Sequence, residues 1–208
     1  MARTDTLINF LTDVAAAIKA KKGDDTAIPA ANFDTEIANL PSGDDSMLIS
    51  LIDRTATSFE IPEGTTSIGG SAFENCTSLS TIVIPHSVTS IGSSFMRGCR
   101  ALKSVVIGDQ VTSIGQSSFS GCSRLESVVI GRNVTYIGSF AFDNCNKVTR
   151  IELLCETPPA VGYDNFSNLQ FTMVDLYIPV NCKSRYKVAF MWEKFAFIYE
   201  SNEKKTQD

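Results

Sequence analysis

Residues 61–152 form four consecutive lines of 23 residues: IPEGTTSIGGSAFENCTSLSTIV, IPHSVTSIGSSFMRGCRALKSVV, IGDQVTSIGQSSFSGCSRLESVV and IGRNVTYIGSFAFDNCNKVTRIE. The same residue types return at the same place in each line. The strictest columns are Ile68, Ile91, Ile114 and Ile137; Gly69, Gly92, Gly115 and Gly138; Cys76, Cys99, Cys122 and Cys145; and Leu79, Leu102, Leu125 and Val148. Self-similarity at such a period predicts a solenoid.

Each line contains two extended pieces and one tight return. In the segment from Leu79 to Ile84, we expect the apolar side chains to point inward, while Thr81 and Val83 point outward. Val-Thr-Ser-Ile-Gly predicts a second short strand that ends in a glycine turn. A single unit is too small to bury a core, so stacked units must cover one another's apolar rows.

The return to the next strand begins at Ala72-Phe73 and its equivalents, and we expect it to be tight and 3₁₀-like. One column at this corner contains Phe73, Met96, Phe119 and Phe142. Met96 is the exception, and Phe95 stands one residue earlier. The second coil should therefore pack its corner differently from the others.

The repeat pattern V-T-x-I-G-x-x-A-F-x-x-C-x-x-L-x-x-I-x-I-P resembles the BspA-like leucine-rich repeats of bacterial and protozoan surface proteins and of some phage proteins. The resemblance covers about half of the chain. It implies a β-rich α+β protein, a leucine-rich repeat solenoid with short N-terminal helices and a C-terminal strand-helix cap. For function it implies a non-enzymatic binding scaffold, because one repeat fold serves many partners.

Composition favours one sizeable globular domain, with or without a small appendage. The chain has 208 residues, 43% of them hydrophobic and 20% charged, and a formal net charge of −5. Residues 59–153 carry seven acidic and seven basic residues, which argues against a nucleic-acid surface. No apolar run approaches the ~18–20 residues of a membrane span. The first residues, MARTD, do not resemble a signal peptide, so we expect a reducing cytoplasm or release by lysis.

Four of the six cysteines occupy one repeat column. Stacked coils would place them in a ladder about 4.7–4.9 Å apart with parallel side chains. Disulfides and zinc sites need sulfur atoms that converge. We therefore predict buried, unbridged thiols and neither metal nor cofactor. The pairing of Cys155 and Cys182 stays open.

Residues 1–40 differ from the repeats and predict a helical attachment or oligomerisation segment, followed by a linker at 41–46. Their apolar residues recur at helical spacing. The candidate docking residues are Leu7, Leu11, Val14, Ile18, Phe33 and Ile37. Two short helices bury too little to stand alone, so they either cap the open end of the solenoid or dock onto a partner. The linker favours docking.

The stretch LTDVAAAIKAKKG, followed by IPAANFDTEIANL, resembles the N-terminal segment of minor structural and tail-associated proteins of phages that infect Gram-positive bacteria. The resemblance covers residues 7–40. It implies attachment to other virion proteins.

The solenoid with its C-terminal cap is predicted to span residues 47–198, followed by a polar tail at 199–208. The period breaks after Leu153, and the prolines of Thr157-Pro-Pro159 are incompatible with a strand ladder. The segment Asp164-Asn-Phe166 is similar in sequence to the Ala-Phe corner of the repeats. We predict a last strand at 174–179 and a helix over 181–197, which together cover the final coil.

No constellation of residues supports catalysis. His86 is the only histidine, and it shares a column with Glu63, Asp109 and Arg132, as expected for a solvated turn. Neither a Ser-His-Asp triad nor a histidine metal site can be built from one histidine in this setting.

The outward valines of three successive coils form the most interesting row. We take as a candidate interface Val83, Val106, Val129, Lys103, Glu126 and Arg150. Valine on a strand surface can reflect β-propensity alone. A flat apolar stripe with charged neighbours can also be a partner surface. Both interpretations stay open.

Two hypotheses follow. The first is a non-enzymatic phage structural protein of the virion (a fibre, tail-associated or decoration protein), made in the bacterial cytoplasm and forming a homo-oligomer, with a trimer favoured. Its repeat surface would serve assembly or bind a host-surface protein or glycan. The second is a bacterial cell-surface adhesin. Neither involves nucleic acid, membrane insertion or a cofactor.

Overall fold

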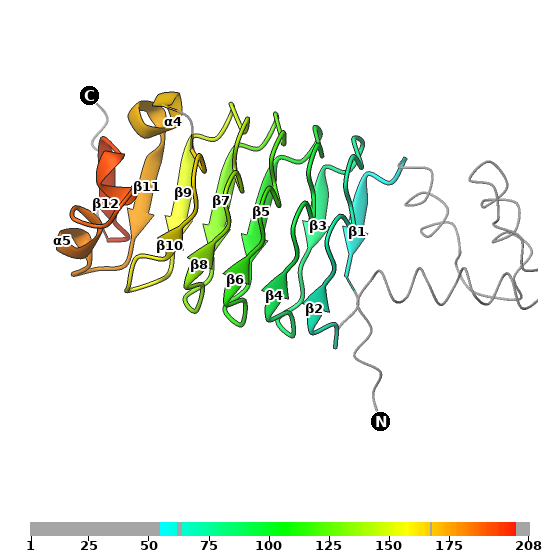
Figure 1. The fold of residues 1–208 in the computed structure, drawn as a ribbon, viewed down its shortest axis with the longest axis horizontal. Helices are drawn as coiled ribbons and strands as arrows, with labels where there is room; N and C mark the ends of the chain where they lie inside the picture. Colours follow the sequence, from blue (N-terminus) through cyan, green and yellow to red (C-terminus); the bar gives the residue numbers. More distant parts are fainter. Residues whose placement is uncertain (1–54, 62–63, 167, 203–208) are drawn as a thin grey trace, which may run out of the picture.

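The computed structural model describes residues 55–61, 64–166 and 168–202. The predicted helical segment 1–40, the linker and the candidate docking residues from Leu7 to Ile37 lie outside these residues. The described part is a β-solenoid whose parallel strands stack along the long axis of Figure 1. The predicted fold class, a BspA-like repeat solenoid, is confirmed.

The longer extended piece of each coil builds the larger strand layer. Its members are β1 (Ser58–Glu60), β3 (Thr81–Val83), β5 (Ser104–Ile107), β7 (Ser127–Ile130), β9 (Arg150–Leu153), β11 (Asp175–Ile178) and β12 (Phe197–Glu200). The parallel pairs are β1–β3 and, in one five-stranded sheet, β5–β7–β9–β11–β12. The Lys103 N–H donates to the Ser80 carbonyl at 3.3 Å, so β3 and β5 belong to neighbouring coils of the same stack.

The Ser-Ile pieces build a smaller sheet on another side of the solenoid (Figure 1). Its strands are β2 (Ser67–Ile68), β4 (Ser90–Ile91), β6 (Ser113–Ile114), β8 (Tyr136–Ile137) and β10 (Ala160–Val161). Strand alternation is as predicted: Leu79 and Ile82 are buried, whereas Thr81 and Val83 are exposed. The core therefore fills the space between the two layers.

The corner after the smaller sheet is the expected tight return, a series of turns with hydrogen bonds of the 3₁₀ type. Its backbone bonds run from Glu74 N–H to Ser71 O at 3.1 Å and from Cys76 N–H to Phe73 O at 3.2 Å. The first residue of the corner adopts a positive φ in every coil. These residues are Ser71 (60°), Ser94 (57°), Ser117 (55°) and Phe140 (59°). A left-handed residue at this point reverses the chain and prevents a continuous helix.

Phenylalanine rings form a buried ladder through the corners. The stack runs through Phe59, Phe73, Phe95, Phe119, Phe142 and Phe166, with neighbouring centroids 5.1–5.9 Å apart. Phe95 supplies the ring that is missing at Met96. The plane of the Phe95 ring lies at 88° to the Phe73 ring and at 89° to the Phe119 ring, whereas the Phe119 and Phe142 rings are parallel within 3°. The prediction that the second coil packs its corner differently is confirmed.

All six cysteines are buried and unbridged, Cys155 and Cys182 included. Three thiols of the ladder donate to carbonyls of the preceding coil: Cys99 to Phe73 at 3.0 Å, Cys122 to Met96 at 3.2 Å and Cys145 to Phe119 at 3.1 Å. Burial raises the pKa of the Cys99 thiol far above its usual range and that of Cys155 to about 11. These three ladder thiols act as small apolar groups that each donate one weak hydrogen bond to the preceding coil.

The C-terminal end corrects one prediction. The prediction of a single helix over residues 181–197 is wrong. In its place stand α5 (Lys183–Tyr186), the 3₁₀ helix η2 (Trp192–Lys194) and the start of β12, while α4 (Asn168–Met173) precedes β11. Met191 has a φ of 72°, which ends any helix at this point. The last predicted strand is confirmed as β11.

The cap secures the segment in which the period breaks. The Tyr186 hydroxyl donates to the Cys155 carbonyl at 2.7 Å, and the Trp192 indole N–H donates to the Pro159 carbonyl at 2.8 Å. Both rings are fully buried. The two side chains therefore satisfy carbonyls that lie outside the strand ladder.

Replacing Phe119 by alanine should lower the free energy of unfolding by about 3–5 kcal/mol, because it opens a cavity in the middle of the ring ladder. Urea unfolding of the full chain measures the loss. Phe140→Ala is the matched control, since Phe140 is 37% exposed and should change stability by less than about 0.5 kcal/mol. Equal losses in the two variants would show that the ladder does not carry the core.

Gly115→Ala should also destabilise strongly. A Cβ atom at this position would lie 2.5 Å from the Ser93 backbone nitrogen, so adjacent coils would have to separate. At Gly108 a Cβ would meet no atom within 4 Å, which makes Gly108→Ala the control. We expect a fall in melting temperature of at least about 5 °C for Gly115→Ala only. A similar shift in both variants would contradict this account of coil spacing.

The six thiols should react with a disulfide reagent at pH 8 only after denaturation. Thiolate is the reactive form, and burial keeps all six sulfur atoms away from water and from the reagent. The absorbance of the thiolate that the reagent releases measures the number of reactive cysteines, and urea-unfolded protein serves as the reference. Rapid reaction of the native ladder would contradict its burial.

Candidate binding surface

The predicted interface residues lie together on the outer surface of the larger strand layer, which we call the outer face. Val83 is 49% exposed, Val106 is 60% exposed and Val129 is half-buried. Val106 pairs with Val129, and Val129 pairs with Glu152. Because the strands are in register, their outward side chains form straight rows across the coils.

The charged residues of the prediction flank this row. Lys103 and Glu126 precede β5 and β7, and the Glu126 N–H donates to the Lys103 carbonyl at 2.8 Å. Both side chains are exposed, as is Arg150 at the start of β9. All six predicted residues therefore share one face of the solenoid.

Beyond Val129 the row changes from aliphatic to charged and aromatic. The Arg150 guanidinium lies 3.0 Å from the Glu152 carboxylate and 3.7 Å from the centroid of the Tyr177 ring. Tyr177 stacks on Tyr199 with centroids 5.4 Å apart and planes at 29°. We call these four residues the arginine–tyrosine cluster. Phe197, 45% exposed, lies on the same face at the start of β12.

Sequence reasoning identified Arg150 but missed Tyr177, Tyr199 and Phe197. Tyr177 could have been found, since the alternation of Asp175-Leu-Tyr-Ile178 places its third residue outward. Tyr199 and Phe197 carried no such signal, because residues 197–200 were assigned to a helix end and a tail.

The turn that contains His86 is solvated, as predicted. His86 is exposed, and the neighbouring coils place Asp109 and Arg132 in the same column. The Arg132 backbone N–H donates to Asp109 at 3.0 Å, and its Nε lies 2.8 Å from Asp109. The backbone bond, followed by the charge of the guanidinium, holds the pKa of Asp109 below its ordinary value. This exposed pair joins two coils, and His86 occupies the same exposed column in the coil before them.

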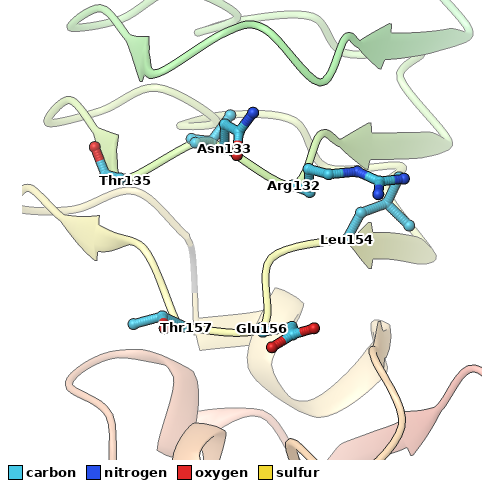
Figure 2. A pocket seen from close by; sticks show the side chains of 7 residues that line it. Arg132, Asn133, Thr135, Leu154, Glu156 and Thr157 are labelled. Carbon is cyan, nitrogen blue, oxygen red and sulfur yellow. The ribbon is translucent and has the colours of Figure 1, made fainter.

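A polar groove opens where the repeat period breaks. Figure 2 shows it between the turn that contains Arg132, Asn133 and Thr135 and the segment that contains Glu156 and Thr157. Its volume is about 410 Å³. Arg132 is paired with Asp109, and the Thr135 hydroxyl donates to the Thr112 carbonyl at 3.1 Å. The groove thus offers fewer available groups than the outer face.

Within the described residues, no three His, Cys, Asp or Glu side chains gather as metal ligands would. The described part of the chain also contains no helix with the length and apolarity of a membrane span. The outer face, with its exposed valines and the arginine–tyrosine cluster, is the candidate surface that the described residues present.

A sequence model of the BspA type leucine-rich repeat region, in six copies, matches residues 53–173. The leucine-rich cell surface protein of Faecalibacterium prausnitzii is 30% identical over 47% of this chain and 32% of its own, with a TM-score of 0.42. The pneumococcal vaccine antigen PcpA is 20% identical over 71% of this chain and 35% of its own, with a TM-score of 0.50.

A leucine-rich repeat protein of Bacteroides ovatus is 19% identical over 71% of this chain and 61% of its own, with a TM-score of 0.28. The chain spans only about a third of the length of the first two solved structures. No curated protein matches the sequence. The similarity to PcpA concerns the fold alone, whereas the repeat match covers more than half of the chain. The chain belongs to the family of BspA type leucine-rich repeat proteins.

Proposed function

We propose that this chain is a non-enzymatic recognition module of a bacterial cell surface and that it binds its partner through the outer face. The observation that carries the proposal is the exposed row of Val83 and Val106, which continues into the arginine–tyrosine cluster. β-propensity accounts for a single outward valine. It gives no reason for the row to continue as Glu152, Tyr177 and Tyr199, with the Arg150 guanidinium of the adjacent row stacked on Tyr177.

Family membership supports the cell-surface hypothesis over the virion hypothesis. BspA-like repeats resemble those of bacterial surface proteins, and the match begins at residue 53. The virion hypothesis depends on residues 7–40, which lie outside both that match and the described residues. No comparison supports a phage role. The repeat fold itself is a scaffold typical of binding proteins.

Rigidity is the physical property that suits the outer face to recognition. Strands β7, β9 and β11 are paired with a neighbour on both sides, so side chains on them lose little backbone entropy on binding. Recognition through such a face also requires no motion of the core. Several weak contacts in one flat array can then act together.

Val106→Lys should leave folding intact and weaken binding at least tenfold. The substitution puts a charge in the middle of the apolar row, which a partner would have to desolvate. Binding of the fluorescently labelled full chain to cultured epithelial cells and to bacterial cells is measured by flow cytometry. Gln116→Lys adds the same charge at an exposed turn after β6 and should bind normally. Unchanged binding by Val106→Lys would contradict the proposed face.

The proposed location has a separate test. Antibodies against the chain should label intact cells of the bacterium that encodes it, and external protease should remove the label. Labelling confined to phage particles or to the cell interior would overturn the cell-surface proposal.

A further inference from the structure

Arg150 is held on two sides before any partner arrives. Its guanidinium contacts the Glu152 carboxylate at 3.0 Å and covers the Tyr177 ring at 3.7 Å from the centroid. A long arginine side chain normally loses about 2 kcal/mol of rotamer entropy when it is immobilised in an interface. These two contacts remove part of that loss, so Arg150 is preorganised for binding.

The Tyr177 ring has neighbours on both of its faces. Strand β11 lies between β9 and β12, so Arg150 and Tyr199 approach Tyr177 from opposite sides. A sugar ring binds an aromatic side chain by laying its C–H groups on an open ring face. Tyr177 presents an edge and a hydroxyl in place of an open face. That arrangement suits a protein surface better than a glycan.

The length of the row also fits a protein partner. From Val83 on β3 to Tyr199 on β12 the row crosses six neighbouring strands. At about 4.8 Å per strand the row is roughly 24 Å long. A standard protein interface covers about 800 Å² on each partner, roughly a disc 30 Å across. Glu60 on β1 pairs with Val83, so with β1 the outer face extends over about 29 Å, close to the width of that disc.

Composition along the row matches the anatomy of such interfaces. Tyrosine and arginine are the residues that most often carry binding energy, and apolar contacts around them exclude water. The Arg150–Glu152 pair is internally neutral. Lys103 and Glu126 offset one another, so Glu60 on β1 and Asp175 on β11 leave the outer face with a net negative charge. A complementary partner would carry basic residues around an apolar centre.

We propose that Arg150, Tyr177 and Tyr199 form the binding hot spot of the outer face and that the partner is a folded protein with an apolar centre and a basic rim. The proposal rests on the proposed function and deepens it by naming the class of partner. It assigns the energy of binding to the end of the row where the repeats become irregular.

The test uses the full chain and the same two cell types, untreated, treated with trypsin, or oxidised with periodate. We expect saturable binding that trypsin abolishes and periodate leaves unchanged. Arg150→Ala and Tyr177→Ala should each weaken binding about tenfold or more. Tyr177→Phe should retain most of the binding because the ring stack remains. Tyr163→Ala is the control, since Tyr163 is 78% exposed in the turn after β10.

Near-ultraviolet circular dichroism and the melting temperature confirm that each variant is folded. Saturable binding that is lost after periodate but survives trypsin would overturn the protein partner and leave the proposed function standing. If the Arg150→Ala and Tyr177→Ala variants bind as tightly as the unchanged chain, the proposed hot spot is wrong. The absence of saturable binding to either cell type would instead contradict the proposed function, and with it this inference.

Discussion

The hydrogen bond from each coil to the one before it is the constraint on which the structure depends. The Thr89 N–H donates to Thr66 O at 2.8 Å, Thr112 to Thr89 at 2.8 Å and Thr135 to Thr112 at 2.9 Å. The threonine hydroxyls of this column repeat the same bonds at 2.9–3.2 Å. Every partner lies 23 residues away, so the length of a coil is fixed by backbone pairing. The glycine, phenylalanine and cysteine columns all follow from that length.

The point where the period breaks shows how strong the constraint is. Strand pairing aligns Ile130 with Leu153 and Tyr136 with Ala160. Along the earlier coil, Ile130 and Tyr136 are six positions apart. Along the next coil, their partners Leu153 and Ala160 are seven positions apart. The extra residue cannot enter the ladder. The additional residue lies in the segment that contains Pro158 and Pro159, where Tyr186 and Trp192 donate to the carbonyls of Cys155 and Pro159.

The periodic part of the fold could be predicted because each residue type is seen four times. Ile68 and its equivalents, or Cys76 and its equivalents, identify an inward column without any knowledge of the partner strand. The C-terminal cap offered no such repetition. Residues 181–197 have the aromatic spacing of a helix, yet Met191 takes a left-handed conformation and Phe197 pairs with Asp175, a contact that local spacing does not encode.

The same reasoning explains which parts of the candidate surface were found. Val83, Val106 and Val129 stand in a repeat column, so their outward direction follows from alternation. The arginine–tyrosine cluster depends on Tyr177 and Tyr199, whose strands share the sheet but not the repeat. Since interaction with a particular partner requires a surface that differs from the family pattern, the residues that break the period are the ones best placed to confer specificity. In this chain the repeated residues stabilise the solenoid, whereas the non-repeated residues at the end of its outer face provide the surface on which specific recognition depends.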